Sequence, residues 1–307
     1  MINRRKFISG CASAMAGSMI PANAYTKTIT PLNTIRKTTP EKAAVIYYSQ
    51  TWHTRIYAEL IAETWEKAGL KVEMVFIKKA EASSLSSYDL IGVGSPVHYL
   101  DAPINVKKWL GSIPSINGTG TAAFVSYGGN GDGQKRAAAN ILKMLSDKGG
   151  VPLGLDMFGN MSTYPPTWSL GNSERILKFR DRPNEKTYDS VRAFASKTLE
   201  QYSKGGIGFE TEPGSIMSGN AMMKPSKLLI SHKLNRAKCI ACGICMRQCP
   251  VGAINIAEAK IDDGKCILCF GCINNCPADA HEMKMLGKKL YSFPEFLKRN
   301  NIKIALP

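Results

Sequence analysis

Eight cysteines near the carboxyl end of the chain form two copies of one spacing pattern. The first copy is Cys239-x2-Cys242-x2-Cys245-x3-Cys249-Pro250, and the second is Cys266-x2-Cys269-x2-Cys272-x3-Cys276-Pro277. Thiolates at this spacing are typical ligands of [4Fe–4S] clusters: three come from one tight loop, and the fourth, just before proline, reaches the other cluster. We therefore predict two clusters with crossed ligand sets. One set is Cys239, Cys242, Cys245 and Cys276, and the other is Cys266, Cys269, Cys272 and Cys249.

Zinc and disulfide bonds are the alternative uses of these cysteines. Zinc sites usually draw on two separated Cys-x2-Cys pairs, whereas each copy here places four cysteines within eleven residues. Such crowding in sequence also makes disulfides among them difficult to form. Two matching sets of four therefore favour iron–sulfur clusters.

The stretch from Leu234 to Met285 resembles the bacterial two-cluster ferredoxins, which implies a small α+β domain. Val251-Gly-Ala-Ile254 follows the first copy as it does in that family. After the second copy, His281 stands where the family usually has an apolar residue. We interpret His281 as mostly structural, because it lies outside the cysteine pattern.

The amino end is typical of an export signal. Asn3-Arg4-Arg5-Lys6-Phe7-Ile8 resembles a twin-arginine motif, and a short apolar run leads to an Ala22-Asn23-Ala24 cleavage site. This route exports folded proteins, so thiolates can be loaded with iron in the reducing cytoplasm before export. We expect residues 1–24 to be a twin-arginine signal peptide, which would remove Cys11, and the protein to be periplasmic.

The middle of the chain alternates strands with helices. Apolar runs predict strands at 43–48, 71–77, 90–95, 121–127 and 151–158; amphipathic periods predict helices at 55–68, 103–110, 135–148 and 184–204. Strands that alternate with helices form a parallel sheet covered on both faces. The fold class predicted for this part is therefore α/β, a flavodoxin-like doubly wound parallel sheet.

Three polar or glycine-rich loops follow strands one, three and four, where a doubly wound sheet binds its ligand. The first loop offers hydroxyls at a helix start, a typical phosphate site. Glycines in the third let the backbone approach a flat ring. Each loop alone is equally consistent with a turn or a helix cap. Together they supply the candidate ligand residues Ser49, Gln50, Thr51, Trp52, His53 and Thr54; Ser95, Pro96, Val97, His98 and Tyr99; and Tyr127, Gly128, Gly129 and Gly131.

Residues from Ala43 to about Gly206 resemble the flavodoxin family, and the whole mature chain resembles flavodoxin–ferredoxin fusions. The resemblance implies FMN, with its phosphate on Ser49–Thr54 and its ring between the second and third loops. One departure is Thr51-Trp52-His53-Thr54, where the family commonly has Thr-Gly-Asn-Thr. Trp52 and Tyr99 could stack on the flavin or simply pack.

The remaining segments complete the expected domain order. We interpret the segments as a linker at 25–40, a flavodoxin-like domain at 41–206, an interdomain linker at 207–233, a ferredoxin-like domain at 234–285 and a basic tail at 286–307. The 307 residues leave room for two cores.

Charge favours an acidic or membrane-associated partner. The net charge is +16, and from Gly214 onward fourteen Lys or Arg face six Asp or Glu. Ordinary solubilising charge is an alternative reading. No nucleic-acid motif accompanies the charge, and no apolar run is long enough for a transmembrane span.

The preferred hypothesis is an exported electron-transfer protein that moves electrons between FMN and two [4Fe–4S] clusters, with a redox protein as partner. One alternative is a flavin-dependent reductase of a small electrophile such as a quinone or nitro compound. Another is a cluster-only carrier whose flavin-free domain serves docking. No nicotinamide fingerprint follows a strand, so electrons are expected from another protein.

Overall fold

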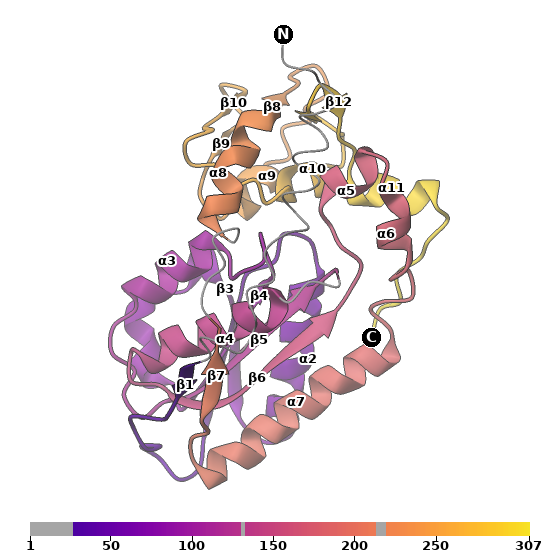
Figure 1. Ribbon diagram of the computed structural model, residues 1–307. Helices are drawn as coiled ribbons and strands as arrows, with labels where there is room; N and C mark the ends of the chain where they lie inside the picture. The colour runs from indigo at the N-terminus through magenta and orange to yellow at the C-terminus, as the bar shows by residue number, and fades with distance from the viewer. Residues whose placement is uncertain (1–26, 130–132, 213–218) are drawn as a thin grey trace.

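A parallel sheet of five strands organises the first half of the chain (Figure 1). The computed structural model describes residues 27–129, 133–212 and 219–307. The sheet order is β3-β2-β4-β5-β6. Strand β3 lies at one edge, and β2, which precedes it in the chain, lies beside it. This order confirms the predicted doubly wound fold. The strands are β2 (Lys42–Tyr47), β3 (Lys71–Phe76), β4 (Leu90–Pro96), β5 (Gly120–Tyr127) and β6 (Val151–Gly159).

Helices cover both faces of the sheet, because its central strands are apolar on both sides. Two helices pack on one face and two on the other. On the first face, the indole Nε1 of Trp65 donates to the Ala195 carbonyl at 3.1 Å and ties the two helices together. The helices are α2 (His53–Lys67) and α7 (Glu185–Lys204) on that face, and α3 (Ile104–Ser112) and α4 (Gly133–Ser146) on the other.

Two local features explain how these elements hold their places. Asn184 and Thr187 form a reciprocal capping box that starts α7. Gly94 in β4 is required by packing, since a Cβ there would lie 2.1 Å from the ring of Phe124. Both features fix the sheet and helices whose loops approach the cysteines.

A smaller unit with its own antiparallel sheet follows. Its strands have the order β12-β11-β8, and a separate hairpin joins β9 and β10. In Figure 1 this unit lies above the large sheet, on the side of the strand ends where α3 begins. The elements are α8 (Asn220–Leu229), β8 (Ile230–Leu234), α9 (Ile244–Gln248), β9 (Ile254–Asn255), β10 (Lys260–Ile261), α10 (Gly271–Asn274), β11 (His281–Met285) and β12 (Lys288–Lys289).

The segments expected to be linkers contain regular structure. Strand β1 (Lys27–Ile29), in the first linker, pairs antiparallel with β7 (Phe209–Thr211), in the second linker. Helix α8 and strand β8 lie in the carboxyl-terminal part of the second linker. Short-range pattern could not reveal the β1–β7 pairing, because its partners are about 180 residues apart. The proposed signal peptide, residues 1–24, lies outside the described residues.

The basic tail folds back on the large domain. Helix α11 (Phe293–Arg299) packs against α5 (Pro165–Ser169) and α6 (Ser173–Leu177) in an aromatic cluster. The Trp168 indole donates to the Tyr291 carbonyl at 3.0 Å, and the Tyr188 hydroxyl donates to the Ala305 carbonyl at 2.7 Å. The tail therefore locks the small unit onto the large one.

No helix in the described ranges is both long enough and apolar enough to cross a membrane.

Candidate functional site

The eight cysteines converge on two neighbouring pockets. One pocket is lined by Cys239, Cys242, Cys245 and Cys276, which we call the outer cysteine set. The other is lined by Cys249, Cys266, Cys269 and Cys272, which we call the inner cysteine set, with Cys245 at its edge. In both pockets the cysteine that precedes proline comes from the other copy of the motif. This is the crossed grouping expected from the spacing.

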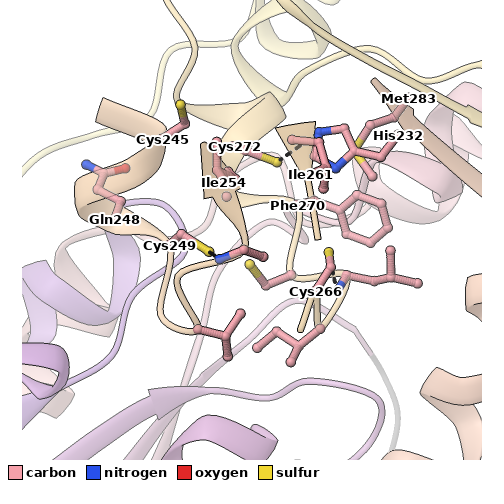
Figure 2. A pocket seen from close by; sticks show the side chains of 16 residues that line it. His232, Cys245, Gln248, Cys249, Ile254, Ile261, Cys266, Phe270, Cys272 and Met283 are labelled. Atoms are coloured by element: carbon pink, nitrogen blue, oxygen red, sulfur yellow. Dashed lines mark hydrogen bonds between the residues drawn. The ribbon is translucent and has the colours of Figure 1, made fainter. Parts of the chain in front are cut away.

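Backbone N–H groups donate hydrogen bonds to three of the cysteine sulfurs. The N–H groups of Ala253 and Ala280 donate to the sulfurs of Cys249 and Cys276 at 3.2 and 3.3 Å, and each lies four residues beyond its cysteine. Leu268 N–H donates to Cys266 Sγ at 3.5 Å (Figure 2). Such N–H···S bonds stabilise negative sulfur and help to set cluster potentials.

The donor set fits iron–sulfur clusters, and no disulfide joins the cysteines of the described residues. All eight cysteines of the described residues are free thiols. Burial raises the pKa of the Cys269 thiol to about 11 and raises that of Cys272 well above its ordinary value. Without a cation these sulfurs would therefore stay protonated at neutral pH, whereas a bound metal deprotonates its thiol ligands outright. Each cysteine set supplies four sulfurs, which is the ligand number of a [4Fe–4S] cluster.

The three strand-end loops are neighbours, because β2, β4 and β5 are adjacent in the sheet. Thr54 Oγ1 of the first loop and Ser126 Oγ at the start of the third lie 2.8 Å apart. Val97 N–H of the second loop donates to the Ser126 carbonyl at 2.9 Å. The predicted residues of these loops are thus brought together, except Gly131, which lies outside the described residues.

The first loop fits a phosphate. No side chain of the described residues caps the start of α2, so its first N–H groups remain available to an anion. The Ser49 hydroxyl donates to the Thr51 carbonyl at 2.6 Å and holds the loop closed on itself. His53 is 2% exposed, and neither ring nitrogen has a protein partner. This donor-rich end of the site fits the phosphate end of FMN, with Ser49, Thr51 and Thr54 as the residues that would hold it.

The second loop makes a tight turn beside the cysteines. His98 and Asp101 form an isolated antiparallel bridge, and Tyr99 and Leu100 between them both adopt positive φ. His98 Nε2 donates to the Leu268 carbonyl at 3.2 Å. Burial lowers the pKa of His98 to about 4, so its ring is neutral near pH 7. His98 therefore anchors the inner cysteine loop to the sheet.

Both predicted stacking residues pack on aromatic neighbours. Trp52 lies 5.8 Å, between ring centroids, from Phe293 of α11. Tyr99 meets Tyr164 edge to face at 6.2 Å, and Tyr164 meets Phe270 beside the inner set at 5.0 Å. Trp52 and Tyr99 thus join the two units through packing, and their stacking role on a flavin remains a prediction.

Further contacts join the first loop directly to the inner cysteine set. Gln50 Nε2 donates to the Cys269 carbonyl at 2.9 Å, and Asn275 Nδ2 donates to the Gln50 carbonyl at 2.6 Å. Tyr48, which is fully buried after β2, points its hydroxyl toward Cys269. The pKa of that hydroxyl lies well above its ordinary value, mainly because the group is buried and also because the Cys269 sulfur is close. Tyr48 and Asn275 were not predicted, because interdomain contacts leave no short-range pattern.

His232, which lines the inner pocket beside Cys272, was also not predicted. Its ring also contacts His281, the residue that departs from the ferredoxin pattern. That departure was the one signal in the sequence that pointed toward this pair.

Comparison with known proteins agrees with the two units. Residues 44–161 match a family model described as flavodoxin domain, and residues 231–289 match one described as 4Fe-4S dicluster domain. No curated protein matches the chain.

Similar solved structures cover the large domain. A flavodoxin from the domain Archaea is 20% identical, spans 52% of this chain and 98% of its own, and has a TM-score of 0.39. Oxidised flavodoxin 1 from Bacillus cereus is 19% identical over 52% of this chain and 98% of its own, with a TM-score of 0.41. Rubredoxin oxygen:oxidoreductase from Desulfovibrio gigas is 18% identical over 54% of this chain and 37% of its own, with a TM-score of 0.39.

Proposed function

We propose that this chain, in which residues 44–161 match a flavodoxin domain and residues 231–289 match a 4Fe-4S dicluster domain, is an exported protein that transfers electrons between FMN and two [4Fe–4S] clusters. One observation carries this proposal. The inner cysteine loop is hydrogen-bonded to two of the strand-end loops, through Gln50 and through His98. The two kinds of cofactor site therefore share one interface.

The chain's own residues set the order of the sites. The strand-end loops touch the inner cysteine set, and the inner set touches the outer set through Cys245. In the outer set, Cys242 is exposed, and the neighbouring Ile240 is 65% exposed. The order is thus strand-end loops, inner set, outer set, surface.

Each part of this arrangement has a task. When bound, FMN supplies paired or single electron exchange, and iron–sulfur clusters supply single electron exchange. Gln50, His98 and Asn275 hold the sites in contact. Tyr99, Tyr164 and Phe270 fill the space between them and exclude water. The cysteine backbone N–H groups stabilise charge on sulfur.

The outer set favours an acidic redox protein as partner. Exposed Arg236, Lys238 and Arg247 each lie within three residues of Cys239 or Cys245, and Arg247 donates to the Cys242 carbonyl at 3.0 Å. An opposite charge on the partner would speed encounter at low ionic strength. Electron transfer to a small acidic ferredoxin should therefore slow as salt rises, whereas transfer to basic cytochrome c should not.

Cofactor content tests the proposal. Protein purified without oxygen should contain one FMN and about eight iron atoms per chain, and the reduced protein should give an EPR signal from two interacting clusters. A protein with both clusters and no flavin would instead support the cluster-only carrier. A protein without iron would exclude both.

Export is a separate part of the proposal, supported by the twin-arginine motif. Replacing Arg4 and Arg5 by lysine in the full chain should keep the protein in the cytoplasm. The matched control is Lys6→Arg, just outside the arginine pair, and this variant should be exported normally. Periplasmic recovery of the double variant at the level of the natural protein would overturn this part.

A further inference from the structure

Two histidines lie between the two cysteine sets. His232 is on β8 and His281 is on β11, and these antiparallel strands pair so that Met283 faces His232 and Leu234 faces His281. Positions two apart on a strand share a face, so both rings project to the same side. His232 Nε2 and His281 Nδ1 are 2.9 Å apart, a hydrogen-bond distance.

Each ring reaches a different pocket. His232 lines the inner pocket, where its Nε2 lies 3.7 Å from Cys272 Sγ; Figure 2 marks this contact with a dashed line. His281 lines the outer pocket and is 1% exposed. The nearest ligand atoms of His232, Cys272 and His281 all lie within 4.8 Å of one another. The imidazole pair therefore bridges the sites of the two predicted clusters.

The chemistry of the pair limits where its protons can be. Of the two nitrogens at 2.9 Å, one must carry hydrogen and the other must accept. His232 Nδ1 and His281 Nε2 are buried without partners among the described residues, so protein contacts there do not decide the tautomer. A negative sulfur near His232 Nε2 favours the tautomer whose hydrogen is on that nitrogen. His281 Nδ1 is then the acceptor.

We propose that the single hydrogen on His232 Nε2 is shared between His281 Nδ1 at 2.9 Å and the Cys272 sulfur at 3.7 Å. In this arrangement His281, as the acceptor, holds the tautomer that keeps the hydrogen on His232 Nε2, and the pair raises the reduction potential of the inner cluster. The inference rests on the proposed function, because it needs a cluster on the inner cysteine set. A hydrogen bond to sulfur stabilises the more negative, reduced state of a cluster. The apolar residue usual at position 281 in ferredoxins could not hold the tautomer.

Redox potentiometry of the anaerobic holoprotein, followed by EPR, tests the pair. His232→Leu should lower the equilibrium constant for one-electron reduction of one cluster about tenfold, which corresponds to about 59 mV. His281→Leu should lower it by a smaller factor. His232→Gln keeps an N–H donor and should restore part of the loss. Ser231→Ala, at the exposed neighbouring position on β8, is the matched control and should change neither cluster.

A second measurement needs no variant at the cluster. Protein labelled with 15N-histidine should show, by pulsed EPR of the reduced clusters, coupling to a histidine nitrogen. Absence of that coupling in fully loaded natural protein would overturn the inference. So would unchanged potentials in a His232→Leu protein that carries its full iron content, even if its melting temperature falls, because a purely structural role affects stability alone. Loss of the proposed function itself is separate: it would appear as absent iron in the natural protein.

Discussion

Gln50 Nε2 donates a hydrogen bond to the Cys269 carbonyl at 2.9 Å. Gln50 belongs to the loop that starts α2, and Cys269 belongs to the inner cysteine set. A single side chain therefore connects the predicted phosphate loop to the loop that would hold a cluster. The distance between the two sites is fixed by protein contacts rather than by a flexible linker.

Gln50→Ala should loosen this connection. Removing a side-chain hydrogen bond to a backbone carbonyl typically costs about 1 kcal/mol, or about a fivefold change in a local opening equilibrium. Amide hydrogen exchange of residues 266–275 should therefore be faster by about that factor. Gln201→Ala is the matched control, because Gln201 Nε2 donates to the Gly205 carbonyl at 2.7 Å on the far end of α7. Equal exchange in the two variants would show that Gln50 does not secure the interface.

The crossed ligand sets predict which cluster each proline-linked cysteine supports. Cys276→Ala should remove one cluster and Cys249→Ala the other, each reducing iron from about eight to about four atoms per chain. In the Cys276→Ala protein the exposed cluster should be lost, so reduction by an external protein should slow while the FMN content is unchanged. EPR checks the assignment, because both variants should lose the interaction between clusters. If Cys276→Ala instead disturbed the inner cluster first, the ligand sets would be uncrossed.

The phosphate loop predicts a hydroxyl that matters for FMN. Thr54→Val keeps the shape of the side chain but removes the hydroxyl next to Ser126, and FMN affinity should fall about tenfold, or about 1.4 kcal/mol. Thr198→Val is the control, since that buried hydroxyl donates to the Phe194 carbonyl within α7, away from the loop. Flavin fluorescence on dilution measures release. A Thr54→Val protein that holds FMN as tightly as the control would place the phosphate elsewhere.

Buried histidines predict acid sensitivity. Burial lowers the pKa of His53 to about 3, whereas an unfolded histidine titrates near 6.5. A depressed folded pKa stabilises the fold above the unfolded value, and this stability is lost as pH falls from about 6.5 toward about 3. Between pH 7 and 5.5, His53 should account for about 1 kcal/mol of lost stability.

Urea unfolding of the His53→Phe protein measures that contribution. The variant should lose less stability than the natural protein over the same pH interval, because phenylalanine does not titrate and still packs against Trp52 and Phe293. An unchanged pH dependence would mean that His53 is already charged or hydrogen-bonded in the folded protein.

Local pattern predicted the fold and much of the site, because those features depend on nearby residues. The Cys-x2-Cys-x2-Cys spacing already determines which three sulfurs share a pocket, and alternation of strands and helices places Thr54 and Ser126 at one sheet edge. Contacts between units could not be predicted in this way. Trp52, which departs from the flavodoxin pattern, packs against Phe293, which lies far along the chain. The same holds for the pairing of His232 with His281, which depends on the register of β8 and β11.

Intramolecular electron transfer tests the central claim most directly. Flavin in the dilute anaerobic holoprotein is reduced by a light pulse, and samples frozen at increasing times are examined by EPR for reduced clusters. We predict that cluster signals grow as flavin absorbance recovers, at a rate that does not depend on protein concentration. Growth that scales with protein concentration, or flavin that stays reduced while the clusters remain oxidised, would contradict electron exchange across the Gln50–Cys269 interface.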